Sequence, residues 1–294
     1  MVKVPVTDAA FEGFRLTRER PRAILAWAGL LLVLSVVTAF VSITLIGEDW
    51  PELRAAMANP PPAPEDAVQL LHQLAPVNAV LIPLNLLVFA MIQCAVARAV
   101  LQPGEGARGY LRLGVDEVRV LASLVLLLLV LALMLIVGSV LASLLSAAAG
   151  GGLVGFLLLV AVLGGLAWLF LRLSLAPVHA FVAKRIDLPG AWRLTRGSAW
   201  RLLGSYVLAF VLAFTVCLLG LAIFAAVAAV VTGGVAAAGA VFQPDYSSLS
   251  TYLNPAVLAG QVVVALVSAL YHTLLLAPGV VAYRALSAPA EHAP

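Results

Sequence analysis

The chain has 294 residues, of which 63% are hydrophobic and 11% are charged, whereas an ordinary soluble domain carries about 25% charged residues. A soluble fold of this size cannot hide so much apolar surface, so the composition excludes a soluble protein and requires that much of the surface face lipid. The formal net charge is +3 and the sequence pI is about 9.1.

Six apolar runs are long enough to cross the hydrocarbon core as helices, which takes about 20 residues. The first follows a basic segment, but it is longer than the roughly 7–15 residues of a secretion signal and is expected to be retained. None alternates polar and apolar residues as the strands of a membrane barrel do. The sequence therefore predicts an all-α, six-span membrane protein, with spans near 23–47, 79–101, 120–148, 153–177, 202–232 and 257–283.

Lysine and arginine set the expected orientation. With the N-terminus in the cytoplasm, every Lys and Arg except Arg54 falls on the cytoplasmic side of the membrane. This asymmetry predicts cytoplasmic N- and C-termini. Together with attraction to anionic headgroups it accounts for the basic character of the chain, so no nucleic-acid partner is expected.

A basic, aromatic phrase recurs along the chain. Phe-Arg-Leu-Thr-Arg at 14–18 matches Trp-Arg-Leu-Thr-Arg at 192–196, and the stretch from Tyr110 matches more weakly. Each copy precedes an outgoing span. The helical spacing of the polar residues, such as Asp8, Glu12, Arg15 and Glu19 in the first copy, predicts three amphipathic helices in the cytoplasmic headgroup layer. The second of these helices is expected to carry Glu105, Arg108, Arg112, Asp116 and Arg119 on its polar face, and the third to begin at an Asp187 N-cap followed by Pro189.

The returning spans also resemble one another, since each ends near an arginine: Arg98, Arg172 and Arg284. The chain is therefore interpreted as one integral membrane domain, 1–294. It contains three pseudo-repeats at about 7–101, 104–178 and 187–286 and a flexible tail at 287–294. Two interpretations of the three arginines remain open: each side chain extends to the nearest headgroups, or the three converge on one anionic headgroup.

The outer connections carry helix-start signals. Pro51 and Pro64 are placed to open short helices in the first and longest connection, and a tight turn is expected at Ser146–Gly152. Asn254 followed by Pro255 predicts an N-cap and first turn for the sixth span.

No catalytic motif, dinucleotide fingerprint or metal-ligand spacing is present, so no enzyme activity, metal or cofactor is expected. All 14 Asp and Glu lie outside the middle of the spans, which disfavours an ion-coupled transporter. Cys94 and Cys217 are expected to be packing residues. The polar residues within spans form either interhelical hydrogen bonds or a ligand site: Asn85, Gln93, Gln261, Tyr271 and His272.

The stretch Ala191–Gly204, AWRLTRGSAWRLLG, resembles a cytoplasmic segment of the multi-span membrane domains associated with bacterial glycerophosphoryl diester phosphodiesterases. The stretches from Gly13 and Tyr110 resemble segments of related proteobacterial inner-membrane proteins. The soluble phosphodiesterase domain of that family is absent here, so its enzyme activity is not implied. The resemblance implies a bacterial inner membrane and a connection with phospholipid.

These observations predict a non-catalytic membrane protein that binds phospholipid headgroups or supports a membrane complex with a protein partner or a second copy. The alternative is a facilitator or exporter of an amphiphilic small molecule. The candidate headgroup-binding residues are Arg98, Arg172, Arg284, Arg193, Arg196 and Arg201.

The orientation can be tested by cysteine labelling in a variant that lacks Cys94 and Cys217. We expect a cysteine at Ser247 to react with an impermeant maleimide in intact cells, and a cysteine at Gly106 or Gly190 to react only after permeabilisation. Labelling of the second group from outside would contradict the six-span orientation.

Overall fold

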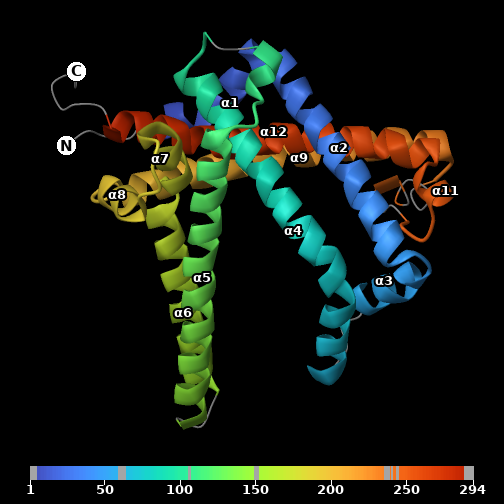
Figure 1. Ribbon diagram of the computed structural model, residues 1–294, viewed down its shortest axis with the longest axis horizontal. Coiled ribbons are helices and arrows are strands. Elements are labelled where there is room, and N and C mark those ends of the chain that lie inside the picture. Colours follow the sequence, from blue (N-terminus) through green and yellow to red (C-terminus); the bar gives the residue numbers. More distant parts are fainter. Residues whose placement is uncertain are drawn as a thin grey trace. The chain divides into compact units, whose positions relative to one another are not determined.

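Helices make up all the regular structure that the computed structural model describes, which covers residues 5–58, 64–104, 107–148, 152–234, 239, 241–242 and 245–287 (Figure 1). Two short 3-10 turns, η1 (Gly47–Asp49) and η2 (Ala107–Tyr110), accompany them. The α-helices are α1 (Val6–Glu19), α2 (Pro21–Leu45), α3 (Trp50–Ala58), α4 (Pro64–Leu101), α5 (Val115–Ala148), α6 (Leu153–Leu173), α7 (Ala176–Ala183), α8 (Leu188–Leu194), α9 (Ala199–Thr232), α11 (Leu249–Tyr252) and α12 (Pro255–Ser287).

Six helical segments are long and apolar enough to cross a membrane, so the predicted all-α, polytopic fold is confirmed. A helix suits this environment because it satisfies every backbone hydrogen bond within one segment, where no water is available. The spanning segments are Pro21–Leu45, Val68–Leu101, Val115–Ala148, Leu153–Ala183, Ala199–Thr232 and Pro255–Ser287.

The chain divides into two compact units. Unit 1 comprises Met1–Leu16, Ala90–Phe210 and Leu274–Pro294, and unit 2 comprises Thr17–Phe89 and Val211–Thr273. Helices α1, α4, α9 and α12 each contribute residues to both units. The division into three pseudo-repeats stays a prediction, although α2 and α9 begin at equivalent places in the repeated phrase, Pro21 and Ala199.

In unit 1, α5 and α6 run side by side as an antiparallel hairpin (Figure 1). Glycines allow this close approach: a Cβ on Gly138 would lie 3.1 Å from Val162, and one on Gly155 would lie 2.6 Å from the Ser146 hydroxyl. Large apolar side chains such as Leu129 and Leu157 stay exposed, as expected of a surface that faces acyl chains. The middle of the tight turn predicted between these helices lies outside the described residues.

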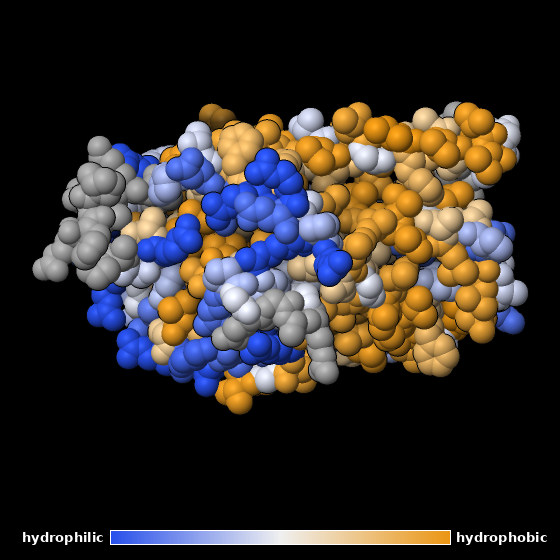
Figure 2. All heavy atoms as spheres, turned by 90° about the horizontal axis from the view of Figure 1, so that it is seen from above, coloured by the Kyte–Doolittle hydropathy of each residue, from blue (hydrophilic) through white to orange (hydrophobic). Residues whose placement is uncertain are grey.

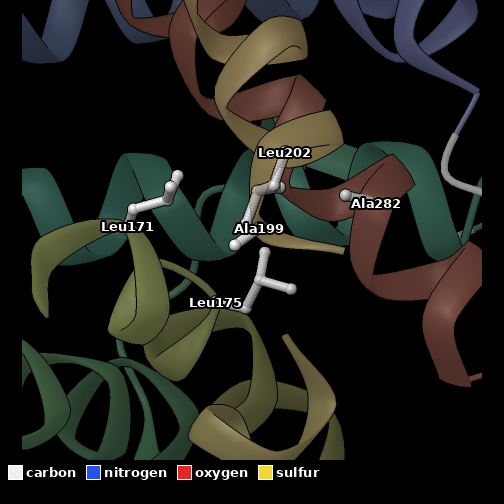
Figure 3. Packing of buried hydrophobic residues seen from close by; sticks show 5 residues of the cluster. All are labelled: Leu171, Leu175, Ala199, Leu202 and Ala282. Carbon is white, nitrogen blue, oxygen red and sulfur yellow. The ribbon is translucent and has the colours of Figure 1, made fainter. Parts of the chain in front are cut away.

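A small buried cluster joins the ends of three helices in unit 1 (Figure 3). Leu171 and Leu175, at the end of α6 and just before α7, face Ala199 and Leu202 of α9 and Ala282 of α12. Small residues let α12 come close, and a Cβ on Gly279 would lie 2.8 Å from the Tyr206 hydroxyl. The cluster places the turn between α8 and α9 next to the end of α6.

Unit 2 is held by a different set of contacts. The Ser35 hydroxyl of α2 donates to the Gln261 side chain of α12 at 2.6 Å, and Cys217 Sγ of α9 lies 3.8 Å from the Val267 carbonyl oxygen. Outside the spans, the Trp50 ring packs against Tyr246 with centroids 4.8 Å apart. These contacts combine polar links within the spans with an aromatic cluster beyond them.

The structure tests several sequence-based predictions about helix ends. Asn254 Oδ1 accepts the Ala256 N–H at 2.9 Å, which confirms the predicted N-cap of α12. Pro64, predicted to open a short outer helix, instead begins α4, which continues through Pro76 and Pro83 into the second span.

The three predicted interfacial helices differ from one another. The first is present as α1, but Glu12, assigned to its polar face, is buried and ion-paired with Arg15 at 2.6 Å. The second is not one helix: η2 is followed by non-helical residues before α5 begins. Gly109 and Tyr110 have φ of +65° and +63°, which interrupts the helical path. The third, α8, has only seven residues.

A close backbone approach at Gly260 in unit 2 gives a stability prediction. A Cβ on Gly260 would lie 2.7 Å from the Val241 carbonyl oxygen, a backbone atom that cannot rotate away, whereas nothing lies within 4 Å of a Cβ on Gly164. We expect Gly260→Ala to cost about 1–3 kcal/mol through overpacking and Gly164→Ala to be neutral or slightly stabilising. Thermal unfolding of the two purified variants in one detergent measures the difference. Equal melting temperatures would show that α12 does not approach Val241 this closely.

Candidate functional site

The repeated basic phrase lies in the connection from α7 to α9, and the N-cap of α8 orients this segment. The Asp187 carboxylate accepts the Gly190 N–H at 2.7 Å, as predicted for the start of α8, and Pro189 occupies the first turn. A Cβ on Gly190 would collide with Asp187 and with His179 Nε2, so Gly190 is a poor cysteine-labelling position.

Charge around Asp187 keeps this cap ionised. The backbone N–H of Gly190 lowers the pKa of the Asp187 carboxyl below its usual range, and the nearby Arg185 guanidinium, at 3.1 Å, lowers it further. Because the folded-state pKa is depressed, this contribution to stability is present above the unfolded pKa and is lost as the pH falls through the folded value. His179 Nε2 lies 3.7 Å from the same carboxylate, and His179 Nδ1 lies 3.2 Å from the Tyr283 hydroxyl of α12.

Thr195 anchors the far end of α8. Its fully buried hydroxyl donates to the Arg172 carbonyl oxygen at 2.9 Å, and it also lies 3.1 Å from the Trp192 carbonyl oxygen. The following turn contains Gly197 with φ of +81°, a conformation that suits glycine. Residues 195–198, including Arg196, are thereby held against the end of α6.

Arg172, in the last turn of α6, lies next to this segment. Its side chain is 6% exposed, and its guanidinium lies 4.4 Å from the Trp192 ring centroid and 6.0 Å from that of Trp168. The Nε atom is buried without a hydrogen-bond partner among the described residues. The Trp168 ring also packs against Trp200, with centroids 6.4 Å apart. Two tryptophan rings therefore lie beside one buried cation, and a third tryptophan packs against one of them.

The remaining basic residues of the phrase, Arg193, Arg196 and Arg201, are exposed, as are Trp192 and Trp200. None of the three arginines forms an ion pair with a described carboxylate. Figure 2 shows hydrophilic side chains gathered on one part of the face that it draws, with hydrophobic side chains over much of the remainder.

Arg98, at the matching place in the first predicted repeat, has acidic partners. It is 4% exposed and pairs at 2.5 Å with Glu117, which is 1% exposed. Its guanidinium also donates to the Tyr110 carbonyl oxygen at 3.1 Å and lies 5.5 Å from the Phe181 ring centroid. Arg98 therefore neither extends to headgroups nor is available to converge on one, because its charge is engaged inside the protein.

Asp116 extends this ion-pair network to the surface. Its carboxylate accepts from Lys184 at 2.8 Å and from Arg119 at 2.6 Å, and it lies 3.9 Å from Arg98. Glu117 accepts the Gly114 N–H at 3.0 Å and so also caps α5. The network joins the ends of α4, α5 and α7.

The third arginine of the trio, Arg284, is exposed near the end of α12. The three therefore occupy three different environments: a buried ion pair, an aromatic enclosure and an open surface.

The polar residues predicted within spans are distributed over both units. Asn85 is exposed and donates to the Leu81 carbonyl oxygen of its own helix at 2.8 Å, and His272 Nδ1 lies 2.6 Å from the Ser268 carbonyl oxygen. Tyr271 and His272 have ring centroids 6.2 Å apart. Gln261 takes part in the interhelical bond with Ser35 described above, and Gln93 is buried in unit 1. Gln261 thus shows the interhelical hydrogen bonding that was one of the two interpretations.

The described part of the chain contains no group of three or more metal-ligating side chains, and Cys94 and Cys217 are free and buried within it. Sequence reasoning assigned no role to Glu117, Trp168 or Tyr283. A signal existed for Trp168, because it lies four residues before Arg172 in the same apolar run and so shares a helix face with it.

Comparison with family models, curated proteins and solved structures finds no match to this chain. The geometry of the basic segment and of Arg172 therefore has to carry the functional proposal.

The buried pair gives a prediction for stability. Glu117→Gln leaves the Arg98 charge buried without compensation and is expected to cost about 3–5 kcal/mol. Replacing both residues, with Arg98→Met and Glu117→Leu, is expected to recover much of this loss because no buried charge remains. Arg119→Gln removes a partly exposed partner of Asp116 and is the control, with an expected cost of at most about 1 kcal/mol.

Thermal or denaturant unfolding of the four purified proteins in one detergent provides the comparison. A double variant less stable than Glu117→Gln alone would show that the pair does not act as a unit.

Proposed function

We propose that this polytopic membrane protein is non-catalytic and binds anionic phospholipid headgroups through its α8–α9 segment, Leu188–Arg201. The proposal places it in a bacterial cytoplasmic membrane with both termini in the cytoplasm. The orientation is supported by the distribution of Lys and Arg. The assignment to a bacterial membrane is supported by the resemblance of the repeated phrase to segments of bacterial inner-membrane proteins.

One observation carries the proposal: this segment has basic side chains without acidic partners. Three of the exposed cations elsewhere in unit 1, Arg15, Lys184 and Arg185, each pair with a carboxylate at 2.6–3.1 Å, whereas Arg284 is exposed without an ion pair among the described residues. Arg193, Arg196 and Arg201 have no such partner among the described residues. Unpaired surface arginines next to a span are free to meet lipid phosphates.

The aromatic residues support the same position at the membrane surface. Trp192 and Trp200 are exposed on the segment that carries the three arginines. Indole rings favour the headgroup level because they are apolar over most of their area and carry one N–H donor. A segment with both features suits the interface between water and hydrocarbon better than either phase.

Charge removal tests the proposal. Each basic residue near an anionic surface contributes roughly 1 kcal/mol, so changing Arg193, Arg196 and Arg201 together to Gln should lower the anionic share of co-purifying lipid several-fold, while a single change should be mild. Quantitative lipid mass spectrometry of the purified full-length protein measures this share.

The matched control changes Arg15, Lys184 and Arg185 to Gln, which removes the same charge from residues that already have acidic partners. We expect the control to retain its anionic lipid. An equal loss in both triple variants would indicate a response to net charge alone, and no loss in either would leave support of a membrane complex as the better proposal.

A further inference from the structure

Arg172 is a buried cation whose charge the described protein does not neutralise. Its side chain is 94% hidden, and its Nε atom has no hydrogen-bond partner among the described residues. Arg196 follows Thr195, whose hydroxyl bonds to the Arg172 carbonyl oxygen, and its charge has the same sign. Burying a charge without a partner of opposite sign is strongly unfavourable.

Arg98 provides the internal comparison. It stands at the matching place of another returning span and is buried to a similar extent, but it has Glu117 at 2.5 Å, Asp116 at 3.9 Å and a backbone carbonyl at 3.1 Å. Unit 1 thus supplies two carboxylates and a backbone carbonyl to one buried arginine, while the described residues supply no acid to the other. A missing acceptor at Arg172 is therefore a specific feature of this place in the chain.

We propose that Arg172 and Arg196 form a discrete binding site for one phosphate group, with Trp192 as its aromatic wall. Guanidinium groups bind phosphate through paired N–H donors, and two of them match an anion with several oxygens. Trp192, 4.4 Å from the Arg172 guanidinium, restricts the planar group to one orientation and excludes water from one side of it.

The protein fixes the backbone that carries both arginines before a ligand arrives. The Thr195 hydroxyl bonds to the Arg172 carbonyl oxygen at 2.9 Å, which ties the residue next to Arg196 to the end of α6. The Asp187 cap sets the start of α8, whose second half carries Trp192. Such preorganisation lowers the entropy cost of binding.

The site deepens the proposed function, because a phosphate at this level of the membrane is most readily supplied by a lipid headgroup. Free inorganic phosphate shares the same chemistry, so the experiment separates the two sources. It uses full-length protein in detergent, titrated with dioctanoyl phosphatidylglycerol and followed by native mass spectrometry, which counts the lipids bound.

We expect the wild-type protein to hold one lipid more tightly than any other, and Arg172→Gln to weaken that step roughly ten- to hundredfold. Arg284→Gln is the matched control, since it removes the exposed arginine at the equivalent place of the last repeat and should leave the step unchanged. Displacement of the lipid by millimolar phosphate would show that the phosphate group itself is bound, and resistance to displacement would show that the acyl chains are also required.

Two further variants test the site even if Arg172→Gln does not fold. Arg196→Gln alters an exposed residue, and Arg172→Lys keeps the charge but loses the planar fork; both should weaken the same single step. Retention of the tight lipid at unchanged affinity in Arg172→Gln, Arg172→Lys and Arg196→Gln would overturn the site.

The readout is independent of the bulk lipid measurement. Loss of one tight lipid in Arg172→Gln, with an unchanged anionic share in the triple variant, would retain this site and reject the wider lipid-binding surface.

Discussion

A guanidinium at the point where a helix leaves the hydrocarbon has to be compensated, and this requirement shapes unit 1. Three returning spans carry such an arginine. Arg284 is compensated by exposure, Arg98 by the buried Glu117, and Arg172 is enclosed by tryptophan rings without an acid among the described residues. Each solution determines the local structure that follows it in the chain.

The pairing of Arg98 with Glu117 explains why the chain between the second and third spans is not an amphipathic helix. Glu117 has to reach both Arg98 and the Gly114 N–H, so α5 starts at Val115 and the preceding residues turn through left-handed backbone at Gly109 and Tyr110. A continuous helix through Gly109 and Tyr110 would place Glu117 and the Gly114 N–H differently relative to Arg98. The buried ion pair thus outweighs the helical periodicity of the segment.

Packing within the spans obeys a different rule from packing at their ends. Along α5 and α6 small residues allow close contact and large apolar residues stay exposed, because lipid is as apolar as leucine and association depends on shape. At the basic end, directional contacts such as Thr195 to Arg172 and Asp187 to Gly190 fix the position of α8. The proposed lipid contacts are located at this directional end, where a few residues with defined geometry can distinguish one headgroup from another.

The sequence alone determined the six spans, the all-α class and the N-caps at Asp187 and Asn254, because these depend on local hydrophobicity and on side chains that bond to their own backbone. It also identified the basic phrase as a feature of helix ends. It did not determine which arginines are buried, since Arg98, Arg172 and Arg284 have similar local contexts. Only the tertiary structure brought Glu117 to Arg98 and Trp192 to Arg172, whereas Trp168 shares a face of α6 with Arg172 through its i, i+4 spacing. Glu117 lies 19 positions after Arg98, and Trp192 lies 20 positions after Arg172. A pattern of hydrophobic and polar residues carries no information about which distant side chain will contact a given charge.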